Sequence, residues 1–164
     1  MKVNDRILKS IFYLSLLLIF QLIVVEVISF NYIKPDILLI GLIYFTLLNG
    51  QIPGMILGFV FGLLMDILSG GVIGSNALSK LIATFFAGYF SREDIDEREI
   101  ISTGFFVILF ISSLIEKFVY IFITSNVDFK YLLLVYVNYG LIPTLVTMVF
   151  SLFMLFFARK SEVR

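Results

Sequence analysis

Five charged side chains lie within or near long apolar segments of this 164-residue sequence, and they are the residues best able to do chemistry. They are Glu26, Asp66, Lys80, Glu116 and Lys117. A charge in the apolar zone of a membrane costs at least about 2.5 kcal/mol, so such a side chain faces protein or water. We expect these five to form one polar cluster whose mutual ion pairs fix helix packing. The alternatives are a site that opens outward for a ligand or partner, and a proton or ion relay.

The composition excludes several other kinds of chemistry. The sequence contains no His and no Cys, so zinc, haem and iron–sulfur sites, thiol catalysis and disulfides are not expected. Lys and Arg total 12 and Asp and Glu total 12, so no basic surface is available for nucleic acid. Carboxylates such as Asp66 can do acid–base work, but nothing in the sequence places one at a substrate. We therefore expect no enzymatic activity and no cofactor.

Hydrophobic residues make up 60% of the chain and charged residues 15%, far from the balance of a soluble domain. Apolar runs of about 20 residues can cross a hydrocarbon core of roughly 30 Å. We predict an all-α integral membrane protein, a single transmembrane domain over residues 1–164. The expected bundle has six helices, with five as the main alternative, at about residues 10–32, 35–48, 54–69, 76–90, 100–124 and 131–158.

The distribution of Lys and Arg predicts the orientation of this bundle. With six helices and both termini in the cytoplasm, eight Lys and Arg residues lie on the cytoplasmic side and three lie outside. That asymmetry agrees with the positive-inside rule. In this orientation Glu26, Asp66, Lys80, Glu116 and Lys117 all lie toward the outer side.

The most regular pattern is a row of small residues at a spacing of four. It consists of Gly50, Gly54, Gly58 and Gly62, followed by Asp66 and Gly70. On a helix such a row forms one continuous ridge, and glycines on a ridge let another backbone approach closely. We expect this ridge to pack against another helix of the same chain, or else to bind a different protein or a second copy.

Local signals mark several helix ends. Pro35 suits the first position of a helix, and Asp36 favours its positive end. The run 49–53, which contains Gly50 and ends in a proline, predicts a tight turn. In the last predicted helix, residues 138–140 together with Pro143 predict a kink.

Residues 35–90 combine three motifs: Pro35–Ile40, the glycine run Gly54–Asp66, and Gly70 with Gly74 and Ala77-Leu78. In this combination they resemble the rod shape-determining protein MreD family. The resemblance implies a non-enzymatic inner-membrane component of the bacterial cell-elongation machinery. It also implies an MreC-like bitopic partner, which connects the protein to MreB-like filaments inside and peptidoglycan synthases outside. Carried over to this sequence, the positions expected to matter are Pro35, Asp36, Gly54, Gly58, Gly62 and Asp66.

Two functions therefore compete. The first is a scaffold of the elongation complex. The second is the substrate-binding S component of an energy-coupling-factor vitamin transporter, which six short helices and the polar residues toward the outer side favour. Members of the family also resemble such S components in helix arrangement. A vitamin pocket should gather several polar or aromatic groups, and the sequence has no Trp, no His and few polar residues within its helices. A proton-coupled carrier is a third alternative, but the sequence lacks the paired repeats and broken helices typical of such carriers.

Overall fold

The structure, a computed structural model, describes residues 2–25, 34–91, 103–125 and 134–161. In these ranges the chain is helical, with short connections and no strand. The six α-helices are α1 (Lys2–Phe20), α3 (Ile37–Asn49), α4 (Gln51–Ser69), α5 (Ser75–Gly88), α7 (Thr103–Thr124) and α9 (Ile142–Ser161). Two π-helical stretches, η1 (Gln21–Val25) and η2 (Val137–Leu141), continue α1 and lead into α9. The predicted all-α fold is confirmed.

The helices differ in how well they suit a membrane crossing. Three spans in the described ranges are long and apolar enough to cross alone: Gln51–Ser69, Gly104–Thr124 and Leu134–Phe153. Ile7–Ile23 and Ile37–Asn49 are apolar but shorter. α5 has 14 residues, so it is only about 21 Å long. It also carries the polar residues Asn76 and Lys80. α5 therefore depends on its neighbours for its place in the bundle.

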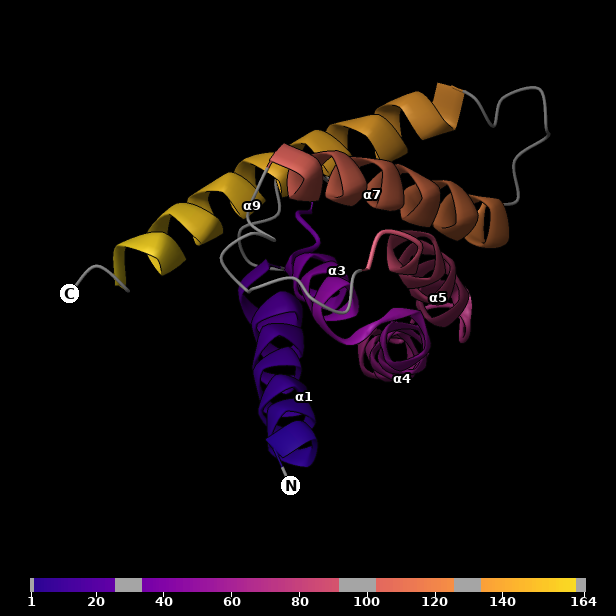
Figure 1. Cartoon of the computed structure of the whole chain (residues 1–164). Coiled ribbons are helices and arrows are strands. Elements are labelled where there is room, and N and C mark those ends of the chain that lie inside the picture. Colours follow the sequence, from indigo (N-terminus) through magenta and orange to yellow (C-terminus); the bar gives the residue numbers. More distant parts are fainter. Residues whose placement is uncertain (1, 26–33, 92–102, 126–133, 162–164) are drawn as a thin grey trace.

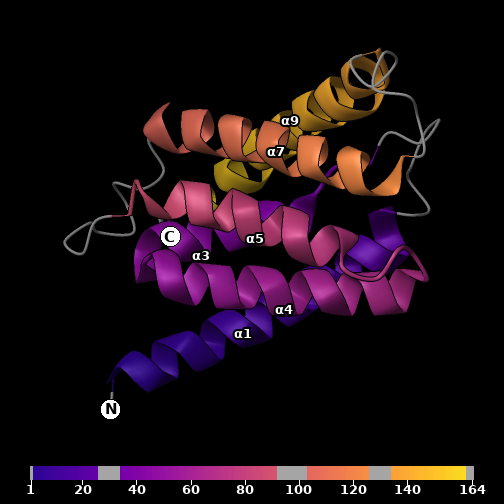
Figure 2. The same cartoon turned by 90° about the vertical axis from the view of Figure 1, so that its right-hand side faces the viewer.

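α4 and α5 run side by side, seen nearly end-on in Figure 1 and lengthwise in Figure 2, whereas α1, α7 and α9 run across the view of Figure 1 and so cross them at an angle. α3, α4 and α5 form the middle of the bundle, with α1 on one side and α7 and α9 on the other (Figure 1). α1 begins and α9 ends at the same end of the bundle as the α3–α4 turn, whereas the α4–α5 turn lies at the opposite end (Figure 2).

Helix α3 lies at the centre because it is apolar on all sides. Leu38 and Leu42 pack into one core with side chains of α1 and α4, while Leu39 and Ile43 pack into a second core with α5 and α7. All four side chains are completely buried. A helix that is hydrophobic all round belongs in the interior, and α3 joins the two halves of the bundle.

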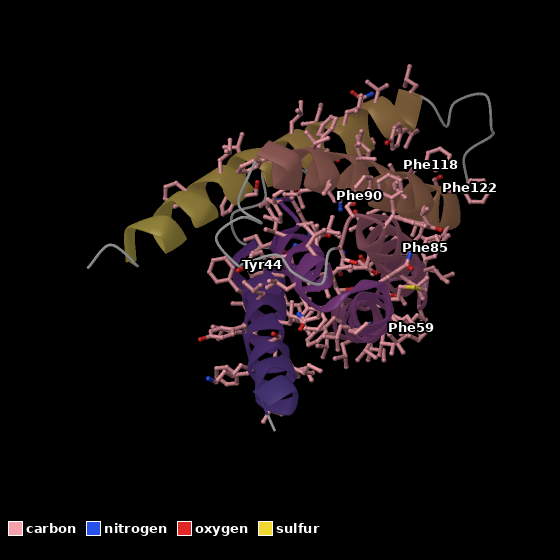
Figure 3. All side chains as sticks on the ribbon, in the orientation of Figure 1. Tyr44, Phe59, Phe85, Phe90, Phe118 and Phe122 are labelled. Atoms are coloured by element: carbon pink, nitrogen blue, oxygen red, sulfur yellow. The ribbon has the colours of Figure 1, made fainter. Side chains whose placement is uncertain are left out.

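The outer surface is rich in large apolar side chains. Phe12 on α1, Phe59 on α4, Phe122 on α7 and Phe153 on α9 are all exposed, and Figure 3 shows Phe59 and Phe122 projecting from their helices. A soluble monomer rarely exposes large contiguous apolar patches, whereas lipid is a suitable environment for such a surface. The distribution of exposed side chains agrees with a membrane protein.

The glycine row lies inside the bundle. A Cβ added at Gly58 would lie 2.7 Å from the Thr84 hydroxyl of α5, and one at Gly62 would lie 2.5 Å from the Asn76 carbonyl oxygen. Gly54 packs in the same way against Thr46 of α3. These close approaches make the α4–α5 contact the most extensive between any two described helices. The glycine face is therefore occupied by the chain's own helices.

The glycines at the two ends of the row, Gly50 and Gly70, form the ends of helices instead of packing against α5. Gly50 has φ +94° and forms the break between α3 and α4, and Gly70 has φ +67° at the end of α4. Left-handed backbone of this kind favours glycine because it has no Cβ. The predicted turn over residues 49–53 shortens to Gly50 alone, since α4 begins at Gln51. Pro53 fits in the first turn of α4, where its missing N–H is not needed.

Two other predicted boundaries differ from the structure, and the chain is irregular where a kink is predicted. α1 begins at Lys2 rather than near residue 10, because a helix can extend beyond its apolar part. α3 begins at Ile37, with Asp36 as its N-cap and Pro35 preceding the cap. Around residues 138–140 the chain forms the π-helical stretch η2, an irregularity that accompanies the proline at position 143 in the next turn.

We predict that Gly62→Ala lowers the free energy of unfolding by about 1–3 kcal/mol, because the added methyl group meets backbone atoms of α5 that cannot move independently. Gly71→Ala is the matched control, since a Cβ there would meet only Ser69 Oγ at 3.5 Å. Denaturant titration of the purified chain in micelles measures both. Equal stability of the two variants would show that α4 and α5 do not pack this closely.

Candidate functional site

The candidate site is a group of four charged side chains in the bundle, which we call the charge cluster: Asp36, Lys80, Glu116 and Lys117. Asp36 is the N-cap of α3, Lys80 lies in the second turn of α5, and Glu116 and Lys117 are neighbours on α7. The cluster joins three helices that are far apart in the sequence. Lys80 and Glu116 are completely buried, and the Lys117 side chain is 15% exposed.

Lys80 is the centre of the cluster. Its Nζ donates to Asp36 Oδ2 at 2.6 Å and to Glu116 Oε1 at 3.1 Å. Lys117 Nζ lies 3.5 Å from Asp36 Oδ2 and 2.8 Å from Glu116 Oε2. Each lysine thus contacts both carboxylates. Two positive and two negative charges give a net charge of zero, which is the arrangement that makes ionic groups tolerable in a low-dielectric interior.

Hydrogen bonds from two further elements hold Asp36 in place. The Gln21 side-chain amide, in η1, donates to the Pro35 carbonyl oxygen at 2.9 Å and accepts from the Ile37 backbone N–H at 2.8 Å. The Asp36 backbone N–H donates to Thr147 Oγ1 of α9 at 3.0 Å. Asp36 Oδ1 accepts from the Leu39 backbone N–H at 2.8 Å, which caps α3. The start of α3 is therefore held in place by η1 on one side and α9 on the other.

Asp66 does not join the charge cluster, contrary to the expectation of one group of five. Its carboxylate instead accepts hydrogen bonds at the start of α5. The donors are the backbone N–H groups of Gly74, Asn76 and Ala77, the Ser75 hydroxyl and the Asn76 side-chain amide, at 2.8–3.2 Å. Unpaired N–H groups at a helix N-terminus attract an anion, and Asp66 supplies it from the last turn of α4.

The other predicted site residues are accounted for as follows. Lys80, Glu116 and Lys117 lie together, and Glu26 lies outside the described residues. Gly54, Gly58 and Gly62 pack against α3 and α5. Pro35 takes part through its carbonyl oxygen, which accepts from Gln21.

Sequence reasoning did not place Asp36 in the charge cluster, and it did not find the contributions of Gln21 and Thr147. The residue pattern assigns Asp36 to a helix start, because it lies at the edge of an apolar run, and the family resemblance adds it to the positions expected to matter without naming its partners. The signal that could have found it is the predicted topology, in which the starts of α3 and α5 lie at the same end of the bundle. Gln21 and Thr147 carry no charge and have no distinctive spacing.

The arrangement suits holding helices together better than it suits chemistry on a substrate. Both carboxylates are already paired with lysines, and the part of the chain that the structure describes contains no group of three residues able to hold a metal. The Ser113 hydroxyl adds a further link, since it donates to Thr144 Oγ1 of α9 at 3.2 Å. The site therefore holds α3, α5, α7 and α9 together through polar contacts.

We predict that Lys80→Met lowers the free energy of unfolding by about 3–5 kcal/mol, because it leaves two buried carboxylates with a single lysine. Lys117→Met should cost less, since that side chain is partly exposed. The charge-balanced double variant Lys80→Met/Glu116→Gln should regain part of the loss. Unfolding in micelles measures all three. A loss from Lys80→Met no larger than that from Lys117→Met would contradict the central place of Lys80.

Comparison with known proteins identifies the family of the chain. No curated protein and no solved structure is significantly similar to the chain. A family model described as rod shape-determining protein MreD, however, matches residues 3–161, nearly the entire chain. That match extends well beyond residues 35–90, on which the resemblance in the sequence rests. The chain belongs to the rod shape-determining protein MreD family.

Proposed function

We propose that this protein is a non-enzymatic scaffold of the bacterial cell-elongation machinery and that it binds an MreC-like bitopic membrane protein. Through this partner it would be linked to MreB-like filaments and to the synthases that build peptidoglycan. Membership of the MreD family supports a role in rod-shape determination. The partner and the scaffold role are our extension of that assignment.

The observation that carries the scaffold proposal is the mutual pairing of the charge cluster. Lys80 and Glu116 are completely buried and bonded to each other, and Asp36 is bonded to Lys80. A ligand site needs polar groups that converge on a cavity and are free to bind the ligand. These groups are instead engaged with one another. The competing proposal, the S component of a vitamin transporter, requires polar groups that remain available.

The partner is expected on the outer surface of the bundle. Gly54, Gly58, Gly62 and Asp66 are buried between the chain's own helices, as are Lys80 and Glu116 of the charge cluster. A bitopic protein crosses the membrane as one helix, and such a helix can pack on exposed side chains of the bundle. Exposed phenylalanines on α1, α4, α7 and α9 allow each part of that surface to be examined separately.

We expect native mass spectrometry of the tagged chain, extracted gently from its own host, to give a complex that contains an MreC-like bitopic subunit. A bound molecule of vitamin size, or copurifying ATPase subunits, would favour the transporter component instead. Cells that lack the protein should lose their rod shape. Unchanged shape would exclude a role in elongation even if a complex were recovered.

A second experiment, photocrosslinking, locates the surface of the bundle that the partner contacts. Benzoylphenylalanine replaces Phe12, Phe59, Phe122 or Phe153 in turn, an aromatic exchange at exposed positions. We expect crosslinks to the bitopic partner from one or two neighbouring positions. Phe105, which is only 2% exposed, is the negative control. Crosslinks of equal yield from all four exposed positions would indicate random encounters in the membrane.

We also propose that the protein lies in the inner (cytoplasmic) membrane with both termini in the cytoplasm. The excess of Lys and Arg on the proposed cytoplasmic side supports this orientation. So does the position of the start of α1 and the end of α9, which lie at the same end of the bundle (Figure 2).

Single-cysteine labelling tests the orientation, because the natural chain contains no cysteine. Val72, in the exposed α4–α5 turn, and Ser91, just after α5, are suitable positions at opposite ends of the bundle. We expect a membrane-impermeant maleimide to label Val72→Cys in intact spheroplasts and Ser91→Cys only after the membrane is opened. The reverse pattern would invert the proposed topology.

A further inference from the structure

One amide side chain lies on the outer, lipid-facing surface of the bundle. Several polar side chains of the long apolar spans, such as Asp66, Glu116 and Thr147, are completely buried between helices. Asn138 differs, because it lies within the span Leu134–Phe153 and its side chain is exposed. An amide that faces hydrocarbon without a full set of hydrogen bonds is strongly unfavourable. The position of Asn138 therefore requires a physical explanation.

The contact that Asn138 makes within its own helix uses only part of its hydrogen-bonding capacity. Its side-chain nitrogen donates to the Leu134 carbonyl oxygen at 3.0 Å, one turn earlier in the chain. An asparagine side chain can donate two hydrogen bonds and accept two. One intrahelical bond thus leaves a donor and an acceptor that a second amide can pair with. The most direct complement of Asn138 is another asparagine.

Asn138 begins an exposed stripe that continues along α9. The further members of the stripe are all exposed and apolar: Ile142, Leu145, Val149 and Leu152. Steps of four and three residues alternate along the stripe, which keeps its side chains on one face of a helix. β-Branched residues alternate with leucines, a combination that favours the pairing of two helices in coiled coils. The stripe has the residue types of a seam between two helices.

The stripe faces away from the bundle. The buried positions of η2 and α9 each follow a member of the stripe by two residues, a rotation of about 200° on a helix. These buried positions are Gly140, Thr144, Thr147 and Ser151. α9 itself lies along one edge of the bundle (Figure 1). No member of the stripe is charged, so two such stripes can meet without repulsion between like charges.

We propose that this stripe, which we call the α9 seam, pairs with the same seam of a second copy of the chain. Homo-oligomers are most often two-fold symmetric, and in such a dimer the same patch of each copy forms the interface. With the two-fold axis along the membrane normal, both copies keep one orientation and each seam residue lies near its own counterpart. The Asn138 amides of the two copies then exchange hydrogen bonds. The proposal does not depend on the scaffold function, and it leaves α1 and α4 available for a bitopic partner.

Cysteine crosslinking in native membranes tests the seam, because the natural chain contains no cysteine. We expect Leu145→Cys to form a disulfide-linked dimer when it is oxidised with copper phenanthroline. Ile56→Cys on α4 is the matched control, since Ile56 and Leu145 are 57% and 56% exposed, and it should give little dimer. Equal dimer yields from the two variants would indicate random encounters and would overturn the proposal.

Co-isolation of two differently tagged copies tests the role of the amide. We expect the two wild-type copies to be recovered together in mild detergent. Asn138→Leu should lower their association constant about 3- to 30-fold, the range for one interhelical hydrogen bond in a membrane. Asn138→Gln keeps an amide and should lose less. Equal losses in the two variants would show that the amides do not pair.

Two further results would overturn the proposal even if a variant fails to fold. The first is that two tagged wild-type copies are never recovered together. The second concerns benzoylphenylalanine placed at Leu145, which we expect to crosslink to a second copy of the chain. A crosslink from this position to a different membrane protein would assign the α9 seam to that protein instead.

Discussion

A buried lysine that must have an anion on each side is the constraint on which the rest of this bundle depends. Lys80 is completely buried in α5, a helix too short and too polar to cross a membrane alone. Its charge is tolerable only because Asp36 and Glu116 lie within 2.6 and 3.1 Å. One side chain therefore requires that α3, α5 and α7 meet at one depth. Lys117 then restores the net charge of the group to zero.

The row of glycines and Asp66 makes that meeting possible. Gly58 and Gly62 let α4 and α5 approach until a single added methyl group would collide. Asp66 binds the N-terminus of α5, where unpaired N–H groups would otherwise be buried. Together these contacts fix the depth and rotation of α5 independently of the ion pairs of Lys80. The row that resembles an interface for another protein is thus a support for the chain's own polar cluster.

The sequence predicts the helices better than it predicts the contacts between them. Apolar runs predict six helices, and among the described residues α3, α4, α5 and α7 begin and end within three residues of the predicted bounds, because length and hydropathy are local properties. They could not give the partners of Asp66, since the same carboxylate suits an ion pair or a helix N-terminus, and only the tertiary arrangement decides between them. Asp36 shows the opposite error: a local role as N-cap concealed a second role as the anion of Lys80. Gln21 escaped notice because an uncharged amide in an apolar run has no pattern to mark it.

An interior that satisfies its own charges has a consequence for function. Because Asp36, Lys80 and Glu116 bind one another, a ligand that entered here would have to break bonds in a low-dielectric region, where broken ion pairs are strongly unfavourable. Binding of another protein on the outer, lipid-facing helix surfaces needs no such rearrangement, since those surfaces are exposed in the chain alone. A bundle with a charge cluster of zero net charge and an apolar exterior can present its helix faces to a membrane partner. That physical division, polar groups for internal order and apolar faces for association, is what we expect of a scaffold within the bilayer.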